Sequence, residues 1–181
     1  LEAYASLYAI DGLEAPQHLR YGLALSRVAY EQKDYKRSIA TSEELLKRSD
    51  LPAATQGELQ LLQGKSEEAT GATGKAQKTY EPLLKNFDTA YGAEAYIRHA
   101  TLLFRAGKVK EVKKQLDTFI AKGTPQQYWL ARAFLLLADC YHKQGETYVA
   151  QQYLESLRDN YKGTNDDIAP MINERLTSYQ N

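Results

Sequence analysis

Apolar residues recur at intervals of three and four along most of the chain, as in the run Val109, Val112, Leu116 and Phe119. This spacing places apolar side chains on one face of an α-helix. Few stretches alternate with the period of two that is typical of a half-buried strand. The pattern therefore predicts an all-α chain, with helices over residues 1–10, 16–31, 34–48, 53–70, 73–86, 89–105, 108–122, 125–143, 146–160 and 166–179.

Four aligned columns of residues indicate that these helices repeat in pairs. The first column holds small residues spaced by 38, 36 and 38 positions: Ser26, Gly64, Ala100 and Ala138. Two later columns keep the same spacings: Ser38, Ala76, Val112 and Ala150, then Leu45, Leu83, Phe119 and Leu157. A column of expected turns lies between the first two: Lys33, Gly71, Gly107 and Gly145. Short side chains let two helices approach closely where they cross, so each unit is predicted to be a pair of antiparallel helices.

These columns resemble the tetratricopeptide repeat (TPR) family over about residues 17 to 160. The best match is the fourth unit, at Phe134, Leu137, Ala138, Tyr141, Gly145, Ala150, Leu154 and Leu157. The resemblance implies an α-α superhelix, a TPR-like solenoid of about four two-helix repeats plus flanking helices. The spacings of 36 and 38 exceed the usual repeat of about 34 residues, which implies longer helices or loops.

The repeat frame predicts one domain over residues 1–181. Its parts are the second helix of a truncated repeat at 1–12, repeats at 17–52, 53–88, 89–124 and 125–162, and a capping helix at 165–181. Ile168, Ile172 and Leu176 would form the apolar stripe of that capping helix, with Asp166 or Asp167 capping its start.

Two local signals refine these helices. Pro82 lacks a backbone donor, so we expect it to kink the second helix of the second repeat or to delay its start. Gly123 suits a helix C-terminus, and Thr124 with Gln127 three positions later is expected to form a capping box, with Pro125 in the first turn.

The composition excludes several classes of function. The 181 residues carry 23 basic and 23 acidic side chains, so no overall field favours nucleic acid or an anionic membrane. No apolar run approaches the roughly 20 residues that span a bilayer, and direct membrane insertion is not expected. The chain begins at Leu1 without a signal-like segment, so we expect it to be part of a longer protein.

Cys140 and His142 are the first candidates for chemistry, because a cysteine beside a histidine can be a nucleophile with its base. Two positions on a helix point roughly 200° apart, however, so a structural cysteine is the favoured interpretation. His18 and His99 lie in other units, with no cysteine or acidic residue at ligand spacing. No metal site is predicted.

Other motifs have simple structural interpretations. Gly74-Lys75 resembles part of a phosphate-binding loop, but Ala69 and Ala76 occupy positions where that loop needs glycine and serine or threonine. Adjacent acids such as Glu67 and Glu68 diverge on a helix. The sequence therefore predicts no catalytic residue, no cofactor and no enzymatic activity.

The resemblance implies that a peptide or protein segment binds along the concave face. The positions that face inward in the family are here Leu23, Arg27, Tyr30, Glu31, Leu61, Lys65, Glu68, Ile97, Thr101, Phe104, Arg105, Leu135, Asp139, His142 and Lys143. One of these positions repeats as Leu23, Leu61, Ile97 and Leu135. It forms either an apolar floor for the partner or part of the packing between helices. The chaperone-binding members use asparagines at positions that hold other residues here, so chaperone tails are not expected as ligands.

The leading hypothesis is a non-catalytic protein-interaction scaffold, with bacterial envelope assembly as its expected setting. The alternative is a helical accessory module of a larger enzyme or carbohydrate-binding protein. The inward positions mix both signs of charge, which suits a peptide of mixed character and not nucleic acid, since nucleic acid needs a sustained basic track. Self-association through the exposed apolar side of the first helix is also expected. The bacterial cell envelope, on the periplasmic side, is favoured over the cytoplasm as the location.

Overall fold

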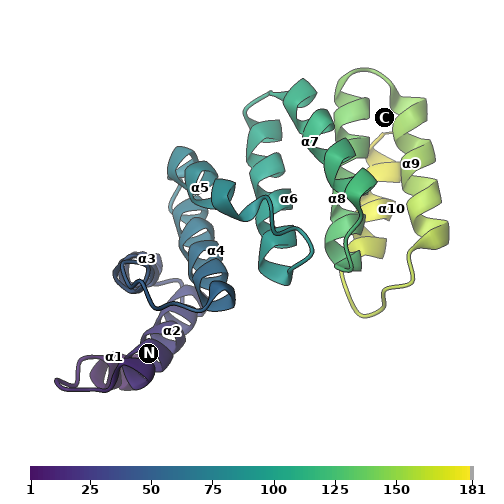
Figure 1. Ribbon diagram of the computed structural model, residues 1–181. Helices are drawn as coiled ribbons and strands as arrows, with labels where there is room; N and C mark the ends of the chain where they lie inside the picture. Colours follow the sequence, from purple (N-terminus) through teal and green to yellow (C-terminus); the bar gives the residue numbers. More distant parts are fainter. Residues whose placement is uncertain (180–181) are drawn as a thin grey trace. The chain divides into compact units, whose positions relative to one another are not determined.

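The computed structural model describes residues 1–179. Within them the helices are α1 (Glu2–Tyr8), α2 (Ala15–Glu31), α3 (Tyr35–Leu45), α4 (Ala53–Ala69), α5 (Thr73–Tyr80), α6 (Ala90–Arg105), α7 (Val109–Lys122), α8 (Gln127–Lys143), α9 (Thr147–Asn160) and α10 (Ile168–Ser178), with a short 3-10 helix η1 (Glu81–Leu83) (Figure 1). All ten predicted helices are present, and no strand occurs among the described residues. The prediction of an all-α fold is therefore confirmed.

The chain divides into two compact units, Leu1–Lys85 and Asn86–Asn181, each with its own core. The first unit contains α1 to α5 and η1, and consecutive helices pack on one another. Its interior includes Leu25, Leu45, Leu59 and Tyr80, which are at most 4% exposed. The break lies near the predicted border between the second and third repeats.

The core of the first unit also holds a cluster of buried serine hydroxyls. Ser26, Ser38, Ser42 and Ser66 are fully buried. Ser26 Oγ lies 2.6 Å from Ser42 Oγ, and Ser66 Oγ donates to Ser38 Oγ at 3.1 Å. Because the hydroxyls satisfy one another, these polar groups are buried at little cost.

The turn column is confirmed by its backbone conformation. Lys33, Gly71, Gly107 and Gly145 all adopt the left-handed region, with φ between 63° and 83°. After each of them the next N–H reaches back to a carbonyl five residues earlier, as from Asp34 N to Ala29 O at 2.8 Å. This is the hydrogen bond of a helix end that closes on a left-handed residue. The same local geometry therefore joins the helices of every pair.

The interruption expected at Pro82 occurs, but in a different form. The α-helix ends at Tyr80, before the proline, and the chain continues as the 3-10 helix Glu81–Leu83. Pro82 occupies the first turn of that element, where a missing donor costs little. The helix is thus shortened at its end; it neither bends nor starts late.

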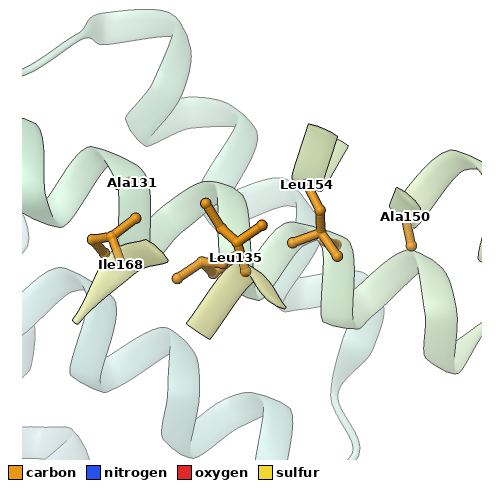
Figure 2. Close-up of a cluster of buried hydrophobic side chains, with 7 residues drawn as sticks. Ala131, Leu135, Ala150, Leu154 and Ile168 are labelled. Carbon is orange, nitrogen blue, oxygen red and sulfur yellow. The ribbon is translucent and has the colours of Figure 1, made fainter. Parts of the chain in front are cut away.

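The second unit contains α6 to α10, and its core joins α8, α9 and α10 (Figure 2). Ala131, Leu135, Ala150, Leu154 and Ile168 are at most 2% exposed and pack in one cluster with Ala138 and Ile172. Met171, Leu176 and Tyr179 pack against that cluster from α10. The predicted apolar stripe of the last helix therefore covers α8 and α9.

The two predicted helix caps differ in the structure. The capping box at Thr124 is wrong: the Thr124 hydroxyl donates to Phe87 O at 2.7 Å, and the Gln127 side chain donates to Thr124 O. The helix starts two residues later than expected, at Gln127. At α10, Asp166 Oδ1 accepts from Ile168 N at 3.0 Å, so Asp166 is the aspartate that binds the helix start.

None of the described helices has the length and apolarity needed to cross a membrane.

Candidate functional site

The first helices of the pairs form one continuous surface within each unit, which we call the first-helix face. In the first unit α2 packs beside α4, and in the second unit α8 packs beside both α6 and α10. All fifteen predicted partner-binding residues belong to α2, α4, α6 and α8. The last helix, α10, thus takes the place of a further first helix.

In the first unit, neighbouring first helices are linked by their side chains. Arg27 and Glu58 form a two-pronged ion pair, with Nη2 and Oε2 2.7 Å apart. Lys65 Nζ lies 4.8 Å from the centre of the Tyr30 ring. These contacts join α2 to α4, and three of the predicted residues take part in them: Arg27, Tyr30 and Lys65.

The other predicted residues of the first unit differ in exposure. Leu61 is 8% exposed and Leu23 is half-buried. Glu31 is exposed, and Glu68 accepts a hydrogen bond from the Tyr80 hydroxyl at 3.2 Å. At Leu61 the structure therefore favours helix packing over an exposed apolar floor.

The second unit has a pocket of about 290 Å³ on its first-helix face, which we call the α6–α8–α10 pocket. Six predicted residues line it: Ile97, Thr101, Phe104, Arg105, Leu135 and Asp139. Ile97 and Leu135 are 2% and 1% exposed, so they form its apolar base and also belong to the core. The structure thus brings together residues from α6 and α8 that are far apart in the sequence.

Three further residues complete the lining: Arg132, Leu136 and Arg175. The inward positions of the repeat pattern do not include them. Arg175 nevertheless lies 36 residues after Asp139, which equals one of the repeat spacings. Extending the repeat frame into the last helix would have found it.

Arg175 anchors α10 to the pocket through Asp139. Its guanidinium donates to both carboxylate oxygens of Asp139, at 2.8 and 2.9 Å. The Tyr179 hydroxyl donates to the same carboxylate. Burial raises the pKa of Tyr179, and this hydrogen bond raises it further, so the phenol remains a neutral donor.

The charge of the pocket is positive on balance. Its lining has three guanidinium groups, from Arg105, Arg132 and Arg175, against the single carboxylate of Asp139. Arg132 also donates to the Tyr128 hydroxyl at 2.9 Å and lies 3.6 Å from Asp167. The mixed charge expected from the sequence therefore becomes locally basic once Arg132 and Arg175 are included.

The remaining two predicted residues of the second unit lie beside the pocket. His142 stacks on the Tyr179 ring with centroids 3.8 Å apart, and its Nδ1 lies 3.1 Å from Thr147 Oγ1. Lys143 Nζ lies 4.8 Å from the centre of the Phe104 ring. Both residues therefore support neighbouring side chains instead of lining the pocket.

Cys140 has the properties of a structural cysteine. Its side chain is fully buried. Burial raises the pKa of the thiol to about 12, with a smaller contribution from the Asp139 charge. A thiol with such a pKa is protonated at neutral pH and is a poor nucleophile.

Among residues 1–179, no cluster of three or more histidine, cysteine or acidic side chains has the arrangement of a metal site. Gly74 and Lys75 lie in the first turn of α5, after the helix turn at Gly71. That turn belongs to the repeat column, as the sequence interpretation proposed.

Comparison with known families identifies the repeat directly. The family model described as "Tetratricopeptide repeat" matches residues 132–164, which cover most of α8, all of α9 and the loop that follows. No curated protein matches the chain. The matched segment contains the left-handed turn at Gly145 and the buried residues Ala138, Ala150 and Leu154. Residues 132–164 therefore match a tetratricopeptide repeat, which supports membership of the tetratricopeptide repeat family for this part of the chain.

Proposed function

We propose that this protein is a non-catalytic interaction module that holds a peptide segment of a partner protein at the α6–α8–α10 pocket. Tetratricopeptide repeats generally mediate protein–protein interaction, and such all-helical folds are typically non-catalytic. The observation that supports the proposal most is the pocket itself, because six predicted residues line it together.

The dimensions and lining of the pocket indicate what would occupy it. A volume of about 290 Å³ is at the lower end of ligand-binding pockets, so it suits one or two side chains of a longer peptide. Ile97, Leu135 and Phe104 offer an apolar surface. The lining has three guanidinium groups against one carboxylate, and this excess of positive charge favours an acidic group beside the apolar one.

A phage-displayed library of random peptides, selected on the purified chain, would provide a ligand for testing. Affinity of the selected peptide is then measured by fluorescence anisotropy for the wild type and for Phe104→Ala. An aromatic residue that is central to an interface contributes about 2 kcal/mol or more, which is roughly a thirtyfold change in Kd. We expect at least that loss, with helical content unchanged by circular dichroism.

Tyr148→Ala is the matched control, because Tyr148 is 73% exposed, lies on α9 and is not part of the pocket. Tyr30→Ala tests the first unit in the same way. Unaltered affinity in Phe104→Ala, in a folded protein, would contradict the proposal. A loss in Tyr30→Ala alone would move the site to the face formed by α2 and α4.

A further inference from the structure

A second recess of the second unit lies between the two second helices, α7 and α9. Figure 1 shows α8 between them, and α8 packs on both. The structure describes all residues of α7 and α9, and these two helices do not pack on each other. Each of these two helices lines a pocket, and we call the surface that contains the two pockets the α7–α9 groove.

One side of this groove is apolar. A pocket of about 400 Å³ is lined by Phe134 of α8 and by the outward residues of α9. Val149, Tyr153 and Leu157 line it at intervals of four, and all three are half-buried. These side chains form a stripe along about two turns of α9.

The opposite side is basic. A second pocket, of about 570 Å³, is lined mainly by α7 and contains Lys110, Lys113 and Lys114. Asp117 is the acidic residue of this lining. Lys110 and Lys114 are exposed, so their ammonium groups are accessible to a binding partner.

Direct contacts join the two sides. Lys113 Nζ lies 3.7 Å from the centre of the Tyr141 ring, and Tyr141 stacks on Tyr153 with centroids 5.3 Å apart. Lys113 also donates to Gln144 Oε1 at 3.0 Å. Burial raises the pKa of Tyr153 most, followed by its interaction with Tyr141; the Asp117 charge also raises this pKa, and the Lys113 charge lowers it. Contacts through Tyr141 therefore connect Lys113 of the lysine pocket to Tyr153 of the apolar pocket.

We propose that the α7–α9 groove binds an acidic amphipathic helix of a partner protein. The apolar stripe of α9 matches the residues that such a helix presents at intervals of three and four. Three lysines against one aspartate in the basic lining favour carboxylates on the flank of that helix. Nucleic acid fits less well, because half of the groove is apolar and the basic part is short. This site is independent of the α6–α8–α10 pocket, since the two share no lining residue.

Two synthetic helical peptides test the proposal against the intact chain. The first has glutamate at its polar positions and leucine at intervals of three and four, over about 18 residues, and the second has lysine in place of each glutamate. Binding is measured by fluorescence anisotropy at physiological salt. We expect the glutamate peptide to bind and the lysine peptide to bind at least tenfold more weakly.

Charge reversal then locates the site. Lys110→Glu with Lys114→Glu changes two exposed lysines and should weaken the glutamate peptide at least tenfold. Lys75→Glu with Lys78→Glu makes the same change at exposed positions of α5 in the first unit and should leave binding unaltered. Val149→Asp should also weaken binding, because it places a carboxylate in the apolar stripe.

Several results would overturn the proposal. Equal affinity for both peptides would show non-specific apolar binding, and equal losses in both double variants would place the site elsewhere. Absence of binding at millimolar peptide would exclude the helix as a ligand. Sedimentation that shows a dimer of the wild type, disrupted by the Lys110 and Lys114 changes, would assign the groove to a second copy of the chain instead.

Discussion

The pair Gly64 and Tyr80 offers a direct test of how the repeat is packed. Residues sixteen positions apart occupy the same two places in every repeat: Ser26 with Ser42, Gly64 with Tyr80, Ala100 with Leu116, and Ala138 with Leu154. All eight positions are buried. The small partner is smallest where the large partner is largest, which indicates that the two volumes compensate each other.

The geometry gives the size of the effect. A Cβ atom on Gly64 would lie 2.3, 2.8 and 2.9 Å from three atoms of the Tyr80 ring, which is itself fully buried. Overpacking of this kind costs about 1–3 kcal/mol, and the upper part of that range applies to so short an approach. The better helix propensity of alanine offsets about 1 kcal/mol. We therefore expect Gly64→Ala to lower the free energy of unfolding by about 1–2 kcal/mol.

Tyr80→Leu alone should cost about 2–4 kcal/mol, because it leaves a cavity and removes the hydrogen bond to Glu68. The double variant gives the second repeat the alanine–leucine combination of the third and fourth repeats. Its methyl group fills part of the space that the ring leaves, so the two changes should couple favourably by about 2 kcal/mol.

Urea unfolding followed by circular dichroism measures the four free energies of this cycle. Fluorescence of Trp129, the single tryptophan, reports on the second unit separately. Additive effects, within about 0.5 kcal/mol, would refute the compensation argument. A gain in stability from Gly64→Ala alone would do the same, because helix propensity would then outweigh the contact.

Three further predictions follow from other features. Lys33→Gly should stabilise the chain by about 1 kcal/mol, because Lys33 is an L residue with a φ of 63°. Gly107→Ala should destabilise the chain by a similar amount. Nothing lies within 4 Å of the added Cβ, so the cost is backbone strain alone. Urea unfolding measures both changes, and equal stabilities would contradict the turn argument. Cys140 should not react with a thiol reagent at pH 8 until denaturant is added, because its pKa is about 12; rapid labelling of the folded chain would disprove this. Deleting residues 165–181 should lower the melting temperature and increase binding of an apolar dye, since burial of Ile168 and Ile172 contributes about 1.5–3 kcal/mol each; an unchanged melting temperature would exclude the role of α10 as a cap.

The helices and their turns could be predicted because their signals are local. The left-handed residue that closes each pair is visible as Lys33 or a glycine at a fixed spacing. The prediction of a capping box at Thr124 was wrong because the contact that Thr124 makes is not local. Its hydroxyl donates to Phe87 O, 37 residues away in sequence, and no local pattern contains that contact.

The candidate site could be predicted only in part. Ile97 and Leu135 follow from the repeat frame, and so does the position of Phe104. Arg132 lies outside the inward positions of the family pattern, and its place beside Tyr128 and Asp167 depends on the packing of the last helix. The division of the chain after Lys85 depends on contacts between helices. Pro82 marks an interruption nearby but does not by itself indicate two units.

The last helix, α10, contributes to both the core and the pocket. Ile168 and Ile172 lie in the core, and Arg175 forms part of the pocket wall. Binding and local order are then thermodynamically linked, and the coupling is equal in both directions. If an ordered α10 raises the ligand's affinity by a given factor, a ligand that contacts Arg175 raises the equilibrium constant for ordering of α10 by the same factor. Amide protons of α10 would accordingly exchange more slowly with solvent as the pocket fills, so the end of the chain would report on the occupancy of the site.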